Sequence, residues 1–179
     1  GTIAVTVDGT VVSTVTKTAI DGGYKCTCTS PTLKDGAHTI SVKASDNDGN
    51  AAAAKTATFT VDTVPPTLQI TAPSNGLITN KKTVTVSGKT DDVSSKPVTV
   101  TVNGATVTVG TDGTFTKDVT LAEGANTITI VAKDKAGKTT TVTRKVTVDT
   151  SAPVIKSVTL TPNPVDCGKT FIIAVEITD

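Results

Sequence analysis

Apolar and polar residues alternate with a period of two along almost the whole chain. In the stretch "PVTVTVNG" at 97–104, Val98, Val100 and Val102 fall on one side and threonines on the other, and "NTITIVAKD" at 126–134 alternates in the same way. Successive side chains of a β-strand point to opposite faces, so this alternation predicts strands that are buried on one side. The 3.6-residue periodicity of an amphipathic helix is not convincing anywhere.

Turn residues end these runs at steady intervals. The turns are Asn103-Gly104, Asp112-Gly113, Glu123-Gly124 and Ala136-Gly137. Short strands separated by glycine turns are typical of an all-β sandwich. The strands expected in the middle of the chain are 67–73, 83–89, 97–102, 105–109, 114–121, 126–133 and 138–149. Valine and threonine dominate the composition, which agrees with a pleated sheet because β-branched residues favour strands.

The sequence also repeats itself. Three pairs of segments match at a spacing of 87 or 88 residues: 33–50 with 121–138, 58–66 with 145–153, and 65–92 with 152–179. A shorter match, "TVDG" at 6–9 with "TVNG" at 101–104, has a larger spacing. The first copy therefore carries extra residues within 10–32. The repeated unit is about 88 residues long, which is enough for a small valine-built core.

The register of the repeats predicts three parts. Residues 65–151 form a complete module of seven strands. Residues 1–64 begin at the third strand and lack the first two, whereas residues 152–179 contain only the first two. The chain is thus expected to hold part of a module, a whole one, and the complementary part of another.

A family resemblance follows from these motifs. A strand ending in "AKDKAGK" followed by one ending in "VDTSAP", with the copies "ASDNDGN" and "VDTVPP", resembles the bacterial immunoglobulin-like modules arrayed in surface proteins. The resemblance covers essentially the whole chain. It implies tandem immunoglobulin-like β-sandwiches in an extracellular or cell-surface protein, where such modules serve as stalks, spacers and adhesins. The cystine and core tryptophan of antibody domains are absent, so antibody-type recognition is not implied.

The incomplete modules have two interpretations. An incomplete sandwich exposes an apolar face and an unpaired edge. The segment is then either an excerpt of a longer tandem array, or a subunit whose last two strands complete residues 1–64 of the next copy, head to tail, in a filament. In both interpretations Pro65-Pro66 and Ala152-Pro153 stiffen the joints and favour a rod.

Three cysteines bear on the second interpretation. Cys26 and Cys28 share a strand face with Tyr24, and Cys167 begins the second strand of the last part. In an immunoglobulin-like sheet the second strand lies antiparallel beside the fifth, so a donated Cys167 would arrive near Cys28 of another copy. The alternatives are partners outside this segment, or three free thiols, because sequence cannot fix connectivity.

Two acidic patterns raise the question of a metal. "ASDNDGN" at 44–50 resembles the start of an EF-hand loop, but its counterpart "AKDKAGK" keeps only an aspartate and a glycine. Both residues are explained by a turn, and Lys55 stands where an EF-hand needs an acidic ligand. A second pattern lies at the expected module junction, where Asp62, Asp91, Asp92 and Asp134 could gather around calcium. The interpretation that the sequence favours is solvated loop charges without a cofactor.

Other chemistry finds no support. The single histidine, His38, matches Asn126 in a turn, so a turn role is expected. The aromatic residues Tyr24, Phe59, Phe115 and Phe171 fall on apolar faces and are expected in cores. Lys and Arg number 17 against 16 Asp and Glu, which gives no reason to expect nucleic acid. No apolar run is long enough for membrane insertion.

The sequence therefore favours a non-enzymatic, extracellular structural protein: a rod of modules in a surface array, an adhesin or a filament. Its expected partners are neighbouring modules or copies of the same protein, and the sequence names no host or matrix ligand. Two alternatives stay open. One is an accessory module of a secreted carbohydrate-active enzyme, and the other is a bacteriophage tail or decoration module.

Overall fold

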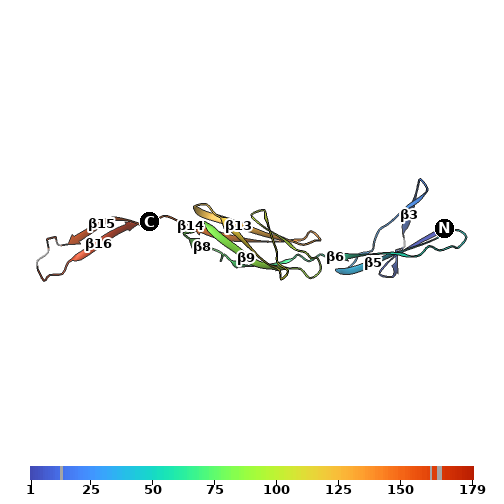
Figure 1. The fold of residues 1–179 in the computed structure, drawn as a ribbon, viewed down its shortest axis with the longest axis horizontal. Helices are drawn as coiled ribbons and strands as arrows, with labels where there is room; N and C mark the ends of the chain where they lie inside the picture. The colour runs from blue at the N-terminus through green and yellow to red at the C-terminus, as the bar shows by residue number, and fades with distance from the viewer. Residues whose placement is uncertain (13, 162, 165–166) are drawn as a thin grey trace.

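The computed structural model describes residues 1–12, 14–161, 163–164 and 167–179, and every regular element in them is a β-strand. The strands form three groups that follow one another along the long axis of the molecule (Figure 1). In the described part of the chain, no helix is long and apolar enough to cross a membrane. The all-β fold predicted from the alternation is confirmed.

The central group is a sandwich of two sheets. The larger has the order β11-β10-β13-β14-β8 and the smaller β12-β9-β7. The strands are β7 (Thr67–Ala72), β8 (Leu77–Thr79), β9 (Thr83–Asp91), β10 (Thr99–Val102), β11 (Ala105–Val107), β12 (Thr114–Thr120), β13 (Gly124–Lys133) and β14 (Thr139–Val148). All neighbouring pairs are antiparallel except β8 and β14.

Alternating residues of both sheets meet in one core. Its fully buried members include Val86 from the small sheet and Val100, Ile128, Ile130 and Val146 from the large one. Burial of such side chains stabilises the fold by about 1.5–3 kcal/mol each. The core is therefore built mainly from valine and isoleucine, together with Leu121 and Phe115.

One strand of this sandwich was not predicted. The strand β8 lies at the edge of the large sheet, and its Leu77 pairs in parallel with Val146 of β14. A strand as short as Leu77–Thr79 carries too few residues to show an alternating pattern. Its position depends on the long-range pairing with β14 rather than on its own sequence.

The first group repeats half of this architecture. Its sheet has the order β2-β1-β5-β6, which corresponds to β11-β10-β13-β14 in the central sandwich. The strands are β1 (Thr2–Val7), β2 (Thr10–Val11), β5 (Gly36–Ser45) and β6 (Lys55–Val61). A small core of Val5, Val7 and Val12 lies on one face.

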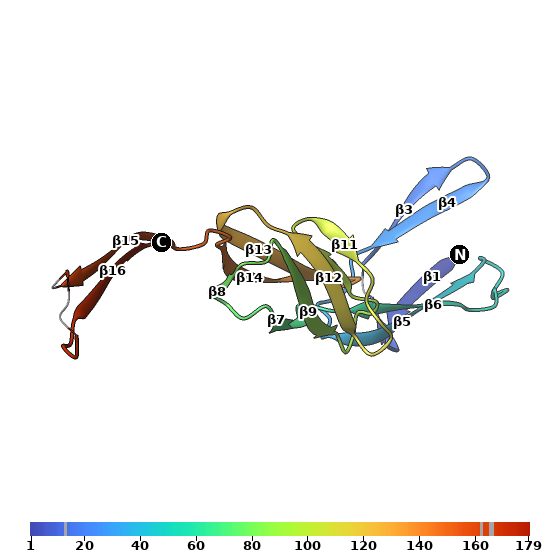
Figure 2. The same ribbon diagram turned by 60° about the vertical axis from the view of Figure 1, so that its left-hand side comes forward.

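The region of the first copy that contains the extra residues forms a separate hairpin. It consists of β3 (Val15–Ile20) and β4 (Gly23–Cys28), which pair only with each other among the described strands. Figure 2 shows the hairpin projecting away from the sheet of β1, β5 and β6. The predicted insertion within 10–32 thus falls in this hairpin, in which β4 precedes β5 as β12 precedes β13 and β3 is the additional strand.

The last group is a single hairpin of β15 (Val154–Thr161) and β16 (Ile172–Thr178). Its large apolar side chains are exposed: the exposed fractions of Ile155, Val158 and Ile172 are 63%, 60% and 69%. No second sheet of the described residues packs on either face, which explains the exposure.

The lack of a covering sheet also explains why two of the aromatic residues are not in a core, as had been expected. Phe115 is buried in the central core and Phe59 is half-buried, but the exposed fractions of Tyr24 and Phe171 are 69% and 48%. Tyr24 lies in β4 and Phe171 directly precedes β16. The expectation of core packing was wrong for these two, because each belongs to an uncovered hairpin.

Candidate metal centre

Three loops meet where the first group joins the central sandwich. Asp62 follows β6 and begins the short linker that ends with Pro65 and Pro66 before β7. Asp92 follows β9, and Asp134 follows β13. Because β9 runs antiparallel to β7, the end of β9 lies beside the start of β7. The end of β13 is at the same end of the sandwich, where Lys135 N–H donates to the Ser95 carbonyl. Residues far apart in sequence therefore come together here.

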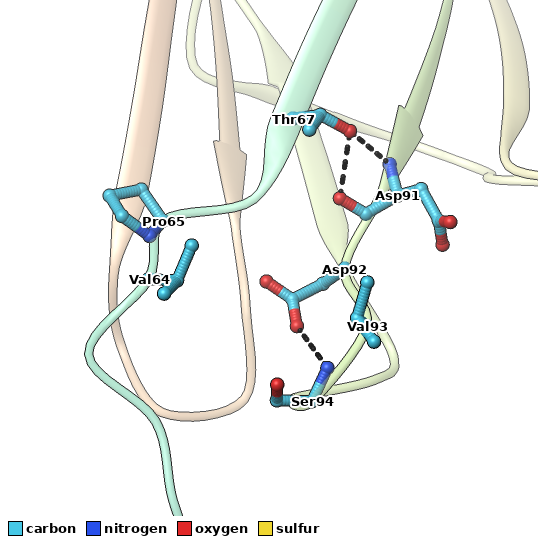
Figure 3. A pocket seen from close by; sticks show the side chains of 7 residues that line it. All are labelled: Val64, Pro65, Thr67, Asp91, Asp92, Val93 and Ser94. Atoms are coloured by element: carbon cyan, nitrogen blue, oxygen red, sulfur yellow. Dashed lines mark hydrogen bonds between the residues drawn. The ribbon is translucent and has the colours of Figure 1, made fainter. Parts of the chain in front are cut away.

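The three aspartates form a compact buried cluster. One carboxylate oxygen of each lies within 4.8 Å of the others, and the exposed fractions of Asp62, Asp92 and Asp134 are 8%, 5% and 4%. The fourth predicted residue, Asp91, does not join them. Its carboxylate points away from the linker, as Figure 3 shows, and pairs with Lys96 Nζ at 2.8 Å in an exposed position.

Backbone amides hold one oxygen of each carboxylate. Val64 N–H donates to Asp62 Oδ1 at 3.1 Å, and Lys138 N–H donates to Asp134 Oδ1 at 2.8 Å. Asp92 Oδ1 accepts hydrogen bonds from two amides of its own loop, at 2.8 and 2.7 Å. Because the first oxygen is fixed in this way, the orientation of the second oxygen is also fixed.

The loops are tied to each other as well. Ala136 N–H donates to Ser95 Oγ at 2.9 Å, and Lys135 N–H donates to the Ser95 carbonyl at 3.1 Å. These bonds join the loop that carries Asp92 to the turn that carries Asp134. The two carboxylates therefore sit on one hydrogen-bonded frame, and the linker supplies the third.

The cluster brings three acidic side chains together without a cationic partner among the described residues. Two like charges about 4 Å apart repel by about 4 kcal/mol at the effective dielectric constant of a protein surface. The ion pairs found in the described residues are those of His38 with Asp8 and of Lys96 with Asp91, and neither involves the cluster. Three carboxylates arranged in this way are suited to hold a cation.

The structure buries Asp62, Asp92 and Asp134 and leaves Asp91 exposed, so the first three are not the solvated loop charges that were expected, whereas a metal at the junction stays a prediction. The physical reason is the short linker, which places Asp62 directly against two loops that already contact each other. Sequence reasoning named all three residues but could not show their burial, because burial depends on the packing of the linker. Among the described residues, this is the one group of three metal-ligating side chains found close together.

The turn that contains Asp46 has a different character. Asp46 Oδ1 accepts hydrogen bonds from the amides of Asp48 and Asn50 at 3.0 and 2.8 Å, and its Oδ2 accepts one from Asn50 Nδ2 at 2.7 Å. Gly49 adopts a positive φ of 89°. Both oxygens are used locally, so the predicted turn role is confirmed.

The thiols form no pair within this chain. Cys26, Cys28 and Cys167 are all free, and the last two are exposed. Cys28 ends β4, whereas Cys167 lies between β15 and β16. The bond between Cys28 and Cys167 of different copies stays a prediction.

His38 lies in strand β5, where it pairs with Phe59, and not in the turn predicted for it, but its side chain bonds to the loop that precedes the strand. Its Nε2 contacts the Lys34 carbonyl at 2.8 Å, in the same way that Asn126 Nδ2 donates to the Ala122 carbonyl at 2.8 Å. Its Nδ1 contacts Asp8 Oδ2 at 2.6 Å. The Asp8 carboxylate, followed by the Lys34 carbonyl, raises the pKa of His38 above its ordinary value of 6.5, and the His38 hydrogen bond, followed by the Thr39 amide, lowers the pKa of Asp8.

This pair predicts a pH dependence. The stabilisation from His38 is present below pH 6.5 and is lost as the pH rises through the raised pKa, whereas that from Asp8 is present above pH 3.8 and is lost as the pH falls through the lowered pKa. An NMR titration of the single histidine should give a pKa above 6.5. In Asp8→Asn it should return toward 6.5. Asparagine suits the positive φ of 49° there, as Asn103 does at 47°; an unchanged pKa would contradict the pairing.

Two family models and one curated protein are similar to this chain in sequence. Residues 1–63 match the family model of a bacterial Ig-like domain, and residues 66–150 match that of domain B of glucodextranase. Bacillopeptidase F of Bacillus subtilis strain 168 is 35% identical over 140 residues, which cover 78% of this chain and 9% of that protein. The chain therefore spans less than a tenth of this curated relative.

Solved structures are also similar. The fibronectin(III)-like modules of CbhA from Clostridium thermocellum are 19% identical, cover 82% of this chain and 77% of their own, and give a TM-score of 0.46. A tetra-tandem repeat from the extending region of a large adhesion protein is 24% identical, covers 97% of this chain and 54% of its own, and gives a TM-score of 0.41. Residues 1–63 thus match a bacterial Ig-like domain, and the sheets described above have the architecture of immunoglobulin-like β-sandwich modules.

Proposed function

We propose that this chain is a non-catalytic spacer of an extracellular protein, in which immunoglobulin-like modules form a stiff rod. The observation that carries the proposal is the joint between the first two groups. Residues 62–66 alone separate β6 from β7, and two of them are prolines. Such a joint restricts the chain, and the groups follow one another lengthwise (Figure 1). A stalk, an adhesin or a cell-surface array requires this shape.

The similarity to bacillopeptidase F supports an accessory role. That protein is named as a peptidase, and the matched segment is 9% of its length. Both ring nitrogens of His38, the single histidine, are occupied by hydrogen-bond partners. We therefore infer that segments like this one hold other parts of a secreted or surface protein at a distance, and that catalysis belongs to other segments.

Small-angle X-ray scattering of the purified chain tests the rod. We expect a distance distribution with a long tail, typical of an elongated particle. Replacing the exposed Pro65 by serine should make the joint more flexible and broaden the distance distribution, while the melting temperature of the central sandwich changes little. A compact profile for the unaltered chain, or identical profiles for both proteins, would contradict the proposal.

A finer proposal concerns assembly by strand donation. In the complete sandwich β12 pairs with β9, whereas β4, at the corresponding place in the first group, pairs only with β3 among the described strands. The hairpin of β15 and β16 corresponds to β7 and β9 in sequence and exposes its apolar side chains. We propose that this hairpin from one copy adds to the free edge of β4 in the next.

The scattering samples also test donation. Donation should give species that lengthen with concentration, and filaments in electron micrographs. On non-reducing gels a ladder should appear that is lost in Cys28→Ser and in Cys167→Ser but kept in Cys26→Ser. Monomers at all concentrations would leave the rod proposal standing and would end donation.

The match to domain B of glucodextranase favours a second candidate, an accessory module that binds carbohydrate. Within residues 66–150 the one aromatic residue is Phe115, whose exposed fraction is 3%. Without an exposed ring, this module offers no stacking platform for sugars. Retardation of the chain in polysaccharide-containing native gels would favour this candidate over the spacer.

A further inference from the structure

We infer that the linker after the first group is held by a pH-sensitive latch, in which protonated His38 fixes the loop before β5 so that Asp35 in that loop binds Thr63 of the linker. The latch rests on the proposed spacer function, because it names a condition that changes the stiffness of the joint. A counterpart of each part of the latch lies in the central sandwich, where none of them titrates near neutral pH.

The loop before β5 binds the linker through one carboxylate. Asp35 Oδ1 accepts a hydrogen bond from Thr63 N–H at 3.1 Å, and the Thr63 hydroxyl donates to Oδ1 and Oδ2 at 3.0 and 2.9 Å. The same contact recurs in the central sandwich, where Glu123 accepts hydrogen bonds from the amide and the hydroxyl of Thr150, both at 2.8 Å. Hydrogen bonds to a charged acceptor are stronger than neutral ones. Each acid therefore fixes the direction in which the chain leaves its strand.

The loop is in turn held by the ring of His38. Its Nε2 lies 2.8 Å from the Lys34 carbonyl oxygen, and its Nδ1 lies 2.6 Å from Asp8 Oδ2. A carbonyl and an ionised carboxylate can only accept hydrogen bonds, so both ring nitrogens must carry hydrogen, as they do in the imidazolium cation alone. The exposed fraction of the His38 side chain is 11%, which leaves little room for water to replace either partner. The contacts therefore require the protonated ring.

The central sandwich has the same arrangement in neutral form. Asn126 takes the place of His38, and it bonds to the loop before β13 at Ala122, donating to the carbonyl at 2.8 Å and accepting from the N–H at 3.1 Å. Asn103 takes the place of Asp8 in the turn between the first two strands of the sheet. Neither amide side chain titrates, so the loop that carries Glu123 is held equally at every pH.

Loss of the ring proton sets a lone pair of the ring against an acceptor. The hydrogen bond to ionised Asp8 is the stronger of the two, so the remaining proton stays on Nδ1 and the Lys34 carbonyl loses its donor. An unpaired carbonyl in a poorly hydrated place costs free energy. The loop is then expected to move away from the ring and to take Asp35 with it, which releases Thr63.

No other charge contacts the ring among the described residues. The charged residues of the elements around it are Asp8 in the turn, Lys34 and Asp35 in the loop, Lys43 in β5 and Lys55 in β6. Lys55 pairs with Val42, four residues along β5 from the ring, and β6 places Phe59 beside the ring at 5.5 Å between centroids. The Asp8 carboxylate, followed by the Lys34 carbonyl, raises the pKa of His38 above 6.5. The latch is thus closed below pH 6.5 and opens as the pH rises through the raised pKa.

NMR on the full chain tests the latch, with Thr150 as the internal reference. Between about pH 5.5 and about pH 8.5, we expect hydrogen exchange of the Thr63 amide, divided by that of the Thr150 amide, to rise about tenfold, roughly the loss of one hydrogen bond to a charged group. The ratio removes the acceleration of exchange by hydroxide, which affects both amides. The chemical shift of the Thr63 amide should change with the same midpoint as the His38 ring, and that of Thr150 should not.

Two variants separate the parts of the latch. His38→Asn copies the side chain of the central sandwich, so it should keep the Thr63 amide protected and abolish the pH dependence. Asp35→Ala removes the contact with the linker, so Thr63 should exchange rapidly at both pH values while His38 still titrates.

The latch is refuted if the Thr63 amide does not follow the titration of His38, if Thr150 follows it equally, or if His38→Asn keeps the pH dependence. The unaltered chain alone can give the first two results, so the test does not depend on how a variant folds. Scattering at the lower pH scores the rod separately. A compact profile there contradicts the spacer, whereas an elongated profile with an unresponsive Thr63 contradicts the latch alone.

Discussion

Replacing Ile130 by alanine is expected to destabilise the central sandwich by about 2–5 kcal/mol, the usual cost of removing a large aliphatic side chain from a core. Ile130 lies in β13 at the middle of the large sheet, and its exposed fraction is 0%. β13 is held on both sides, by β10 and β14. The sheet therefore cannot close around the cavity without losing hydrogen bonds.

Denaturation followed by circular dichroism measures this loss. The midpoint should fall while the slope of the transition stays constant, because the same surface is exposed on unfolding. Ile78→Ala is the matched control, since Ile78 is 73% exposed in β8, and it should change the free energy of unfolding by less than about 0.5 kcal/mol. An equal effect of both substitutions would contradict the packing described for β13.

Replacing Gly88 by valine is expected to cost about 1–3 kcal/mol or more, by overpacking. Gly88 lies in β9, and a Cβ there would press on the Gln69 carbonyl oxygen and come within 2.8 Å of Phe115 Cζ. The Gln69 oxygen is backbone and cannot move aside without disturbing the pairing of β7 with β9, whose register shifts between Ile70 and Ala72.

The melting temperature of the central sandwich reports this effect. Gly23→Ala in β4 is a suitable control because no atom lies within 4 Å of a Cβ built there. A Gly88→Val protein that melts with the unaltered one would show that β7 and β9 can separate at little cost. In that case Phe115 would have to take another rotamer, which a crystal structure of the variant would reveal.

The strands could be predicted where one face is buried against a second sheet. The alternation in β10, β13 and β14 reflects the packing of two sheets, because every second residue there faces the opposite sheet. In β15 and β16 the same apolar pattern is present, yet the described residues place no layer against it. The sequence therefore predicts that β15 and β16 have an apolar face suited to pack on a second sheet. It does not predict whether a second sheet covers that face.

The acidic residues show the other limit of sequence reasoning. Asp91 and Asp92 are neighbours of the same type, but strand geometry directs one to solvent and the other into the joint. Spacing alone could group both with Asp62 and Asp134. In the structure, the backbone amides of Val64 and Ser94 fix the orientation of the Asp62 and Asp92 carboxylates. This orientation distinguishes them from a carboxylate at the surface, and it cannot be read from the sequence.

The parallel pairing of β8 with β14 also determines how the central sandwich would carry tension. Force along a rod enters near the start of a module and leaves near its end. Here the force enters through β7 and reaches β8 next, where it would pull the beginning of β8 and the end of β14 in opposite directions. The bonds from the Gly76 amide to the Lys145 carbonyl and from the Asp149 amide to the Thr79 carbonyl would then be sheared together rather than opened one at a time. A three-residue strand at the sheet edge, small in its contribution to burial, would thus act as the mechanical clasp of the module.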